Sequence, residues 1–427
     1  MNLLRKINGN ALIKDSFWAI FGNIVLRGLS VVSGIFVARL LGSDSYGVFT
    51  TLKGLLLTVT VFSTMGLGYS ATKFFAEYLT LNRGLLKSLY RYIIKITILF
   101  SAIIALILFA SSDWYAKELL KDESLSFSVK VLAISIVFNA LSFTQIGVIS
   151  GLKKFKELSI LNVVIGILSF VITLILSYFW GFEGSIYSLL GTSLVNYIAN
   201  EIFLNRTLNH NEHSIDKVDR NLKRLIMRET FPVALQEISF TLASWLSSIL
   251  LIKYSNYTDV ANYNIAMQWN AIILFIPGAL RNVILSHLSI NSNEKEKRRS
   301  VMKQTILINL ISTGIPAIFV LLFASFIVAL YGTAYSGLKE LITVALFITI
   351  PMSISNVFSQ AFMTINKNWL MFSIRAIRDI LTILIFILLT KSDLVTAPIA
   401  MLYSSLVCST ITLLVFIKIY NSKLANL

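Results

Sequence analysis

Long uninterrupted apolar runs are the feature that most limits what this chain can fold into. The run YIIKITILFSAIIALILFA (92–110) contains a single charged residue, Lys95. A helix needs about 20 apolar residues to cross the hydrocarbon core of a bilayer, whereas the strands of a membrane β-barrel show short alternating segments. The chain has 56% hydrophobic and 14% charged residues and a mean hydropathy of +0.77, outside the range of soluble domains. The sequence therefore predicts an all-α, polytopic membrane protein.

The apolar runs and the polar loops between them divide the chain into about twelve predicted membrane spans. The predicted spans are 16–41, 48–69, 90–110, 126–149, 159–179, 185–204, 231–252, 263–286, 304–330, 341–364, 369–390 and 395–417. The longest polar connection separates six spans from six. This predicts an N-terminal bundle (1–210), a cytoplasmic linker (211–230) and a C-terminal bundle (231–427).

Sequence landmarks recur at similar positions in the two halves. Tyr46 follows the first predicted span, Tyr263 follows the seventh, and further echoes follow the third and fourth spans. This common spacing favours two parallel repeats related by a pseudo-two-fold axis along the membrane normal, a layout typical of transporters. The alternative is that twelve evenly spaced spans produce such echoes by coincidence.

Basic residues are distributed unevenly between the two sides of the predicted membrane. Of the 37 Lys and Arg residues, 24 lie on the side of the two termini and 5 on the other side. This bias follows the positive-inside rule and predicts that both termini are cytoplasmic. Basic segments such as NEKEKRRSVMK (293–303) are expected to contact anionic membrane lipid, not nucleic acid, despite the net charge of +16. The segment 72–91 mixes aromatic and basic residues, which is typical of a helix lying in the membrane plane.

The sequence carries no motif of an enzyme or of a resident cofactor. It has no G-x-x-x-x-G-K-[ST] phosphate loop, no G-x-S-x-G and no H-E-x-x-H. Its one cysteine, Cys408, excludes an internal disulfide. His210 and His213 are spaced as on one helical face, but they lie in the central polar loop, where a solvated loop is the simpler interpretation than a metal site. We expect no catalytic residue, no metal and no cofactor.

Several ionisable residues fall deep inside predicted spans, and most of them are basic. The deep bases are Arg27, Lys53, Arg281, Arg375 and Arg378, and the deep acids are Glu237 and Asp379. A charge at the centre of a membrane helix costs about 2.5–3.5 kcal/mol on insertion scales, so it requires a partner or a wet cavity. Guanidinium and ammonium groups suit phosphate oxygens, so the excess of bases predicts an anion-binding cavity. Arg375 and Asp379 lie four residues apart on one helical face, and an internal ion pair is the alternative for these two.

Uncharged polar residues at membrane depth complete the predicted cavity. Amide side chains of this kind suit a sugar, and the candidates are Gln145, Gln236, Gln268, Asn270 and Gln360. The alternative for each is an interhelical hydrogen bond, which membrane helices use in packing.

Separate stretches of the sequence resemble one transporter family. NIVLRGLSVVSGIFVARLLGSDSYGVFTTLKG (23–54), GLKKFKELSILNV after the fourth span and LYGTAY after the ninth resemble polysaccharide-repeat-unit flippases. These are the O-antigen type of the multidrug/oligosaccharidyl-lipid/polysaccharide exporter superfamily. The resemblance implies two six-helix bundles in a V shape around a central cationic cavity. In related lipid II flippases an arginine precedes an A-R-x-x-G ending of span 1. Arg27 matches that arginine, whereas Ser33 stands where those flippases have a second one.

The resemblance implies transport of an undecaprenyl-diphosphate-linked oligosaccharide from the cytoplasmic to the periplasmic leaflet of the bacterial inner membrane. The deep bases are then expected to bind the diphosphate, with Glu237 or Asp379 coupling a proton. Such a pathway has a polysaccharide polymerase and a chain-length regulator as candidate protein partners. Two alternatives stay open. One is a cation-coupled multidrug exporter of the same superfamily, for which a carboxylate-dominated cavity is expected. The other is a non-transporting membrane scaffold for glycan assembly.

Overall fold

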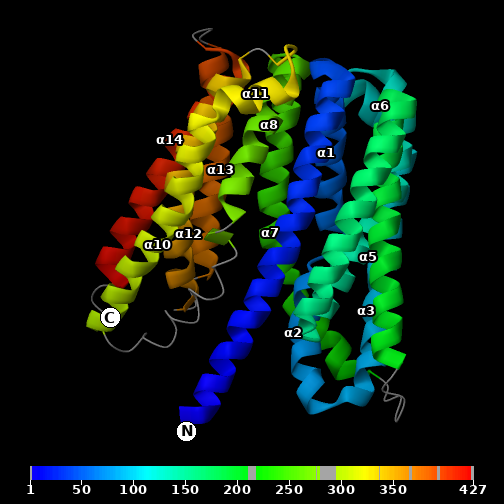
Figure 1. Ribbon diagram of the computed structural model, residues 1–427, viewed down its shortest axis with the longest axis vertical. Helices are drawn as coiled ribbons and strands as arrows, with labels where there is room; N and C mark the ends of the chain where they lie inside the picture. The colour runs from blue at the N-terminus through cyan, green and yellow to red at the C-terminus, as the bar shows by residue number, and fades with distance from the viewer. Residues whose placement is uncertain are drawn as a thin grey trace. The chain divides into compact units, whose positions relative to one another are not determined.

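The chain folds into long helices. The computed structural model describes residues 2–209, 218–275, 277–278, 295–335, 337–364, 368–391 and 395–424. These residues are almost entirely helical and contain no strand, so the predicted all-α fold is confirmed (Figure 1). The α-helices of the first half are α1 (Asn2–Thr64), α2 (Leu67–Leu81), α3 (Leu86–Ala110), α4 (Ser112–Trp114), α5 (Ser126–Gly151) and α6 (Phe155–Asn209). Those that follow are α7 (Arg220–Tyr254), α8 (Tyr257–Ile273), α10 (Lys295–Leu322), α11 (Ala324–Tyr331), α12 (Leu338–Thr364), α13 (Asn368–Thr390) and α14 (Ala397–Ile419).

The two longest helices each contain two predicted spans. α1 has 63 residues and α6 has 55; at 1.5 Å per residue, either is more than twice the roughly 30 Å of a hydrocarbon core. Each is broken at one glycine with positive φ, Gly42 (φ 75°, ψ 171°) and Gly181 (φ 55°, ψ −126°). Glycine adopts this backbone region without steric cost. Both breaks fall where the sequence predicts the connection between two spans.

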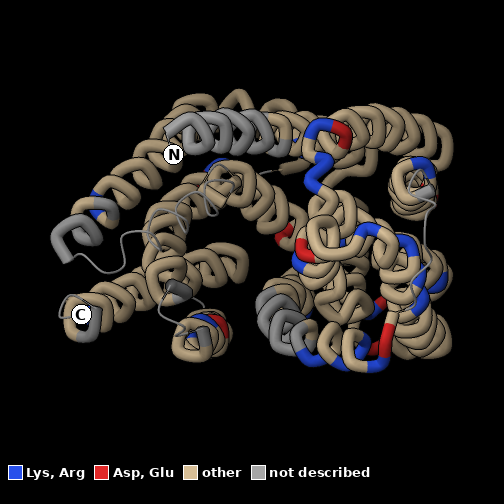
Figure 2. Tube along the Cα trace, turned by 90° about the horizontal axis from the view of Figure 1, so that it is seen from below, with Lys and Arg blue, Asp and Glu red and all other residues tan. Residues whose placement is uncertain are grey.

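Seven helices within the described residues are long and apolar enough to cross a membrane, and α1 and α6 are among them. Large hydrophobic side chains are exposed along these helices, for example Leu106 on α3 and Leu322 on α10. Figure 2 shows long helical stretches without any charged residue. This combination is that of a multi-pass membrane protein whose outer surface meets lipid.

The predicted in-plane helix at 72–91 is interrupted in the structure. α2 ends at Leu81, and Asn82 has an extended backbone with φ −157°. The Asn82 Oδ1 accepts a hydrogen bond from the Gly84 backbone N–H at 3.0 Å, and α3 begins at Leu86. The expectation of one continuous helix was wrong because the asparagine side chain competes for a backbone amide and starts a new turn.

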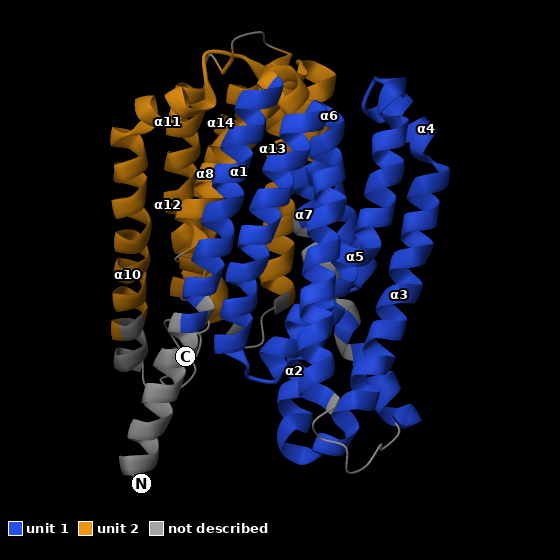
Figure 3. Ribbon diagram, turned by 45° about the vertical axis from the view of Figure 1, so that its right-hand side comes forward, with its two compact units in different colours: residues 1–41, 51–245 blue, residues 42–50, 246–427 orange. Residues whose placement is uncertain are grey.

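The first of two compact units comprises Met1–Leu41 and Thr51–Trp245 (Figure 3). α2, α3, α5 and the end of α6 contribute its hydrophobic core. Fully buried members of this core are Phe74, Phe75, Ile93, Val148 and Leu204. The core therefore joins segments separated by more than a hundred residues of sequence.

α2 and α5 pack backbone against backbone inside the first unit. A Cβ atom placed on Gly147 would lie 2.0 Å from the Gly68 carbonyl oxygen. The Thr72 hydroxyl donates a hydrogen bond to the Gly147 carbonyl oxygen at 3.0 Å. Small residues allow membrane helices to approach this closely, so this contact requires glycine at position 147.

The second compact unit comprises Gly42–Thr50 and Leu246–Leu427. Its core is contributed by α10, α12, α13 and α14, with the buried residues Met302, Phe358, Phe362, Met371 and Phe416. α8 packs on α12 within the same unit, where the Asn270 Nδ2 donates to the Ala345 carbonyl oxygen at 2.8 Å.

Residues 42–50, which we call the α1 connector, belong to the second unit although both flanking parts of α1 belong to the first (Figure 3). The Asn264 Nδ2 donates a hydrogen bond to the Thr50 hydroxyl at 3.0 Å. A Cβ atom on Gly47 would lie 1.9 Å from the Tyr257 carbonyl oxygen. The connector is thus packed tightly against the start of α8.

Candidate functional site

Two of the predicted anion-binding bases lie on α1, on opposite sides of its glycine break. Arg27 precedes Gly42 by 15 residues and Lys53 follows it by 11, which places them about 22 and 16 Å along the helix from the break. The Arg27 side chain is exposed, and that of Lys53 is half-buried. Ser33 is buried and donates to the Leu29 carbonyl oxygen of its own helix at 2.9 Å. Both predicted bases therefore lie within the helical stretch Ile20–Thr64, which is long and apolar enough to cross a membrane.

A hydrogen-bonded carboxylate lies within the first unit. Glu201 of α6 accepts hydrogen bonds from the Tyr90 hydroxyl of α3 and from the Gln145 Nε2 of α5, the latter at 2.7 Å. Asn205 donates to the other carboxylate oxygen at 3.0 Å. Tyr90 and Gln145 are 6% and 0% exposed. Polar groups of three helices thus meet at one carboxylate. Gln145 makes an interhelical hydrogen bond here, which is the alternative to a sugar-binding role that the sequence left open.

A second group of charged residues lies on α13 in the second unit. The Asp379 Oδ1 accepts from Arg378 Nε at 2.8 Å and from Arg378 Nη2 at 2.6 Å, and the two side chains are 21% and 14% exposed. One turn earlier, Arg375 Nη2 donates to Asn356 Oδ1 at 3.1 Å and to Ser359 Oγ at 2.9 Å on α12. These interactions join α13 to α12, which is long and apolar enough to cross a membrane.

The ion pair on α13 differs from the four-residue pair considered from the sequence. Asp379 pairs with its neighbour Arg378, whereas Arg375 donates to the polar side chains of α12. Two neutral acceptors on a facing helix thus accept hydrogen bonds from the Arg375 guanidinium. Among the described residues, this group contains two guanidinium ions and one carboxylate and is therefore net positive.

Two of the predicted polar residues are buried in the second unit. Asn270 is 3% exposed and is occupied by its hydrogen bond to α12. Gln360 is equally buried, and its Oε1 has no hydrogen-bond partner among the described residues. Gln268, on α8, is half-buried.

The remaining candidates fall where the structure gives no side-chain description. Arg281, His210 and His213 lie outside the described residues. Gln236 and Glu237 are part of helix α7, but their side chains lie outside the described part of the chain.

Sequence reasoning did not identify two residues that hold these charged groups, Tyr90 and Ser359. Tyr90 binds a carboxylate 111 residues away, and no local pattern indicates this contact. Ser359 follows Asn356 by three residues on α12, so the two lie on one helical face. The sequence signal for Ser359 is this pairing of polar residues three positions apart within an apolar run.

A family model described as polysaccharide biosynthesis protein matches residues 12–277, more than half of the 427 residues. The chain belongs to the polysaccharide biosynthesis protein family.

This polysaccharide biosynthesis protein is also similar to an uncharacterized membrane protein, MJ1375, of Methanocaldococcus jannaschii. The two are 24% identical over 340 residues, which cover 76% of this chain and 78% of the relative.

The fold of this polysaccharide biosynthesis protein is similar to the folds of solved MATE family transporters of the MOP superfamily. An inward-facing structure of a multidrug resistance MATE family transporter has a TM-score of 0.79 and 15% identity, covering 93% of this chain and 94% of the other. An outward-facing structure of a multidrug resistance MATE family transporter has a TM-score of 0.68 and 14% identity, covering 97% and 96%. At this level of identity the likeness concerns the fold.

Proposed function

We propose that this protein is a flippase that works by alternating access and moves an undecaprenyl-diphosphate-linked oligosaccharide repeat unit, of O-antigen or a similar surface polysaccharide. The observation that carries the proposal is the set of basic side chains on long helices. Arg27 and Lys53 lie on an apolar helix of one unit, and Arg375 of the other unit donates to the apolar helix α12. The polysaccharide biosynthesis family and the transporter fold support the same substrate class and activity. A buried cation in a membrane requires an anionic or polar partner, and a diphosphate supplies several acceptor oxygens.

In this proposal the diphosphate binds to a set of bases that the substrate meets in turn. The set comprises Arg27, Lys53, Arg281, Arg375 and Arg378. The hydrogen bonds of Arg375 to α12 hold its guanidinium in one orientation before substrate arrives, which lowers the entropy cost of binding. Gln268, half-buried on α8, is the described amide best suited to contact the sugars. Glu237 and Asp379 are the groups proposed to couple proton movement to turnover.

The proposal places the protein in the bacterial inner membrane with both termini in the cytoplasm. Translocation then runs from the cytoplasmic to the periplasmic leaflet, and the basic loops contact anionic lipid. In this proposal residues 1–210 and 231–427 are the two six-helix bundles, and the segment 211–230, in which α7 begins at Arg220, connects them. A polysaccharide polymerase and a chain-length regulator are the proposed protein partners.

A cation-coupled multidrug exporter is the second candidate, because the solved structures with this fold are described as multidrug transporters. It requires acidic groups facing the transport route. Glu201 is a described acidic residue of the first unit, and its carboxylate accepts hydrogen bonds from Tyr90 and Gln145.

The test is headgroup translocation by purified protein in vesicles. Undecaprenyl-diphosphate-linked oligosaccharide with a fluorescent sugar is placed in one leaflet, and its arrival in the other is followed with a membrane-impermeant enzyme that releases the label. We expect Arg27→Gln to slow translocation about tenfold to a hundredfold, the loss that follows removal of a charge-assisted hydrogen bond. Arg39→Gln is the matched control, because Arg39 is exposed near the end of the same helical segment.

Three outcomes contradict the proposal. Wild-type protein that leaves the label in its original leaflet is not a flippase for this lipid. If Arg27→Gln and Arg39→Gln slow translocation equally, Arg27 has no specific role in binding the headgroup. Extrusion of a cationic dye by the same vesicles, without headgroup translocation, assigns the chain to drug export.

A further inference from the structure

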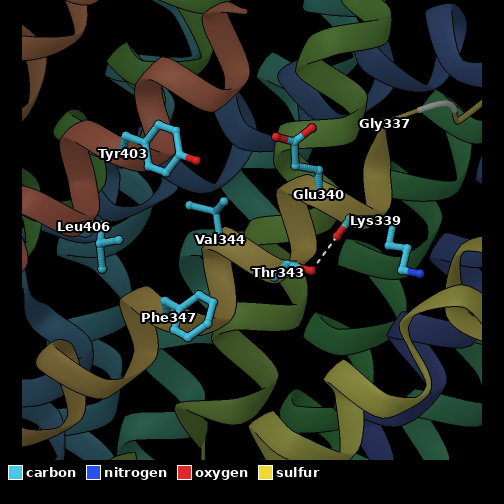
Figure 4. Close-up of a pocket in the computed structure, with 8 residues that line it drawn as sticks. All are labelled: Gly337, Lys339, Glu340, Thr343, Val344, Phe347, Tyr403 and Leu406. Atoms are coloured by element: carbon cyan, nitrogen blue, oxygen red, sulfur yellow. Dashed lines mark hydrogen bonds between the residues drawn. The ribbon is translucent and has the colours of Figure 1, made fainter. Parts of the chain in front are cut away.

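An open groove lies between α12 and α14 in the second unit. Its volume is about 610 Å³, within the range of roughly 300–1,000 Å³ typical of small-molecule sites. Figure 4 shows the side chains that surround it. The lining residues are Gly337, Lys339, Glu340, Thr343, Val344, Phe347, Tyr403 and Leu406.

The groove runs from a helix end into a membrane span. On α12 its lining extends from Gly337, directly before the first helical residue, to Phe347, a length of about 15 Å at 1.5 Å per residue. Both α12 and α14 are long and apolar enough to cross a membrane. One end of the groove therefore lies at the depth of lipid headgroups and the other in hydrocarbon.

The end near the start of α12 carries polar groups of opposite charge. Lys339 and Glu340 are exposed, and the side chains of both, like the Tyr403 hydroxyl, have neither an ion pair nor a hydrogen bond among the described residues. In Figure 4, Glu340 lies between Tyr403 and Lys339, and the Tyr403 hydroxyl is directed toward the Glu340 side. The Thr343 hydroxyl is already occupied, since it donates to the Lys339 carbonyl oxygen at 2.9 Å.

The deeper part of the groove is apolar. Val344 and Phe347 of α12 and Leu406 of α14 line it, and the Phe347 side chain is 53% exposed. An acyl chain laid along these residues covers apolar surface that the helices themselves leave open.

We propose that this groove binds one zwitterionic phospholipid of the phosphatidylethanolamine type. Its ammonium pairs with the Glu340 carboxylate, its phosphate accepts from Lys339, and one acyl chain follows Val344, Phe347 and Leu406. A headgroup with both a positive and a negative charge can pair with both Glu340 and Lys339, whereas a purely anionic headgroup is repelled by the Glu340 carboxylate. The proposal does not depend on the transport activity.

Native mass spectrometry of the full-length protein tests the headgroup preference. The protein is equilibrated in detergent micelles with equal amounts of palmitoyl-oleoyl phosphatidylethanolamine and phosphatidylglycerol, and the retained lipid adducts are counted. We expect the wild-type protein to retain more phosphatidylethanolamine than phosphatidylglycerol. Glu340→Gln should lower retention of phosphatidylethanolamine about fivefold, the effect of losing one partly exposed ion pair. Lys339→Gln should lower the retention of both lipids.

Glu183→Gln is the matched control, because Glu183 is an exposed carboxylate beside the Gly181 break and is not one of the residues that line the groove. It should leave the preference unchanged. Equal retention of the two lipids by the wild-type protein overturns the proposal, as does a preference that survives Glu340→Gln. Displacement of phosphatidylethanolamine by an equal amount of undecaprenyl phosphate also overturns it and assigns the groove to a prenyl lipid.

Discussion

Asp379 shares its ion pair with the preceding residue of α13, and this arrangement determines the effect of removing either charge. The Arg378 side chain contacts one carboxylate oxygen through two nitrogens. Both side chains are mostly buried, where an uncompensated charge is far more costly than at a wet surface. Removing one charge of the pair should therefore lower the free energy of unfolding more than removing both charges.

We expect Arg378→Met to lower the free energy of unfolding by about 2 kcal/mol, less than the roughly 3–5 kcal/mol of a fully buried pair because solvent reaches part of it. The double variant Arg378→Met/Asp379→Leu should recover most of this loss, since no unpaired carboxylate is left behind. Thermal unfolding in detergent measures both, with Arg39→Met as the exposed control. A double variant no more stable than the single one would show that the unpaired carboxylate is not the cause.

At the same scale, the sequence locates the deep charges but not their partners. Arg375 and Asp379 are visible because a charge interrupts an apolar run, and helical spacing then favours pairing them with each other. The structure pairs Asp379 with Arg378 and directs Arg375 to Asn356 and Ser359. Which partner prevails depends on the rotation of α13 against α12. Side-chain packing of the whole unit sets that rotation, and the local sequence does not encode it.

Among the elements, α2 and α5 show that the close packing of two membrane helices can require glycine, which has no side chain. Gly68 and Gly147 bring the two backbones together, and the Thr72 hydroxyl bridges them. The contact is rigid on both sides, because the atom closest to a Cβ placed at position 147 is a backbone oxygen. A methyl group at this position cannot be accommodated by a rotamer change.

Gly147→Ala should therefore force the helices apart and lower the free energy of unfolding by about 1–3 kcal/mol, the usual cost of overpacking. Gly54→Ala is the matched control in a helix, since a Cβ at Gly54 meets no atom within 4 Å and alanine favours a helix over glycine. Urea or thermal unfolding of the purified variants in detergent compares the two. Equal stability of the alanine variants would mean that α2 and α5 can separate at little cost.

The helices themselves are predictable because about 20 consecutive apolar residues have few other stable conformations in a membrane. The breaks at Gly42 and Gly181 lie in the short connections that the sequence predicts between spans. The interruption at Asn82 was not predicted, because amphipathic patterning continues across it while a single side-chain hydrogen bond ends the helix.

For the whole molecule, the proposed transport has an electrical consequence. One elementary charge crossing the full membrane potential changes the free energy by about 2.3 kcal/mol per 100 mV. With the inside negative, a complete cycle that carries an anionic headgroup outward goes downhill, because the binding residues return to their starting positions and only the headgroup charge is displaced. Membrane voltage should therefore assist net transport over the complete cycle.

We expect headgroup translocation in vesicles to accelerate when valinomycin and a potassium gradient impose an inside-negative potential, and to slow when the potential is collapsed. The Arg27→Gln variant serves as the low-activity reference in the same assay. A rate that does not change between the two conditions would rule out a voltage contribution, while leaving the identity of the substrate to the translocation assay itself.

Because the α1 connector belongs to the second unit, the two units do not correspond to the N-terminal and C-terminal halves of the sequence. Residues 42–50 come from the early chain yet pack on Tyr257 and Asn264. A gene divided at the central loop would therefore produce a C-terminal polypeptide that lacks a piece of its own interior. Exchanging halves between relatives would likewise pair a connector from one parent with a docking surface from the other, so chimeras should preserve the two together.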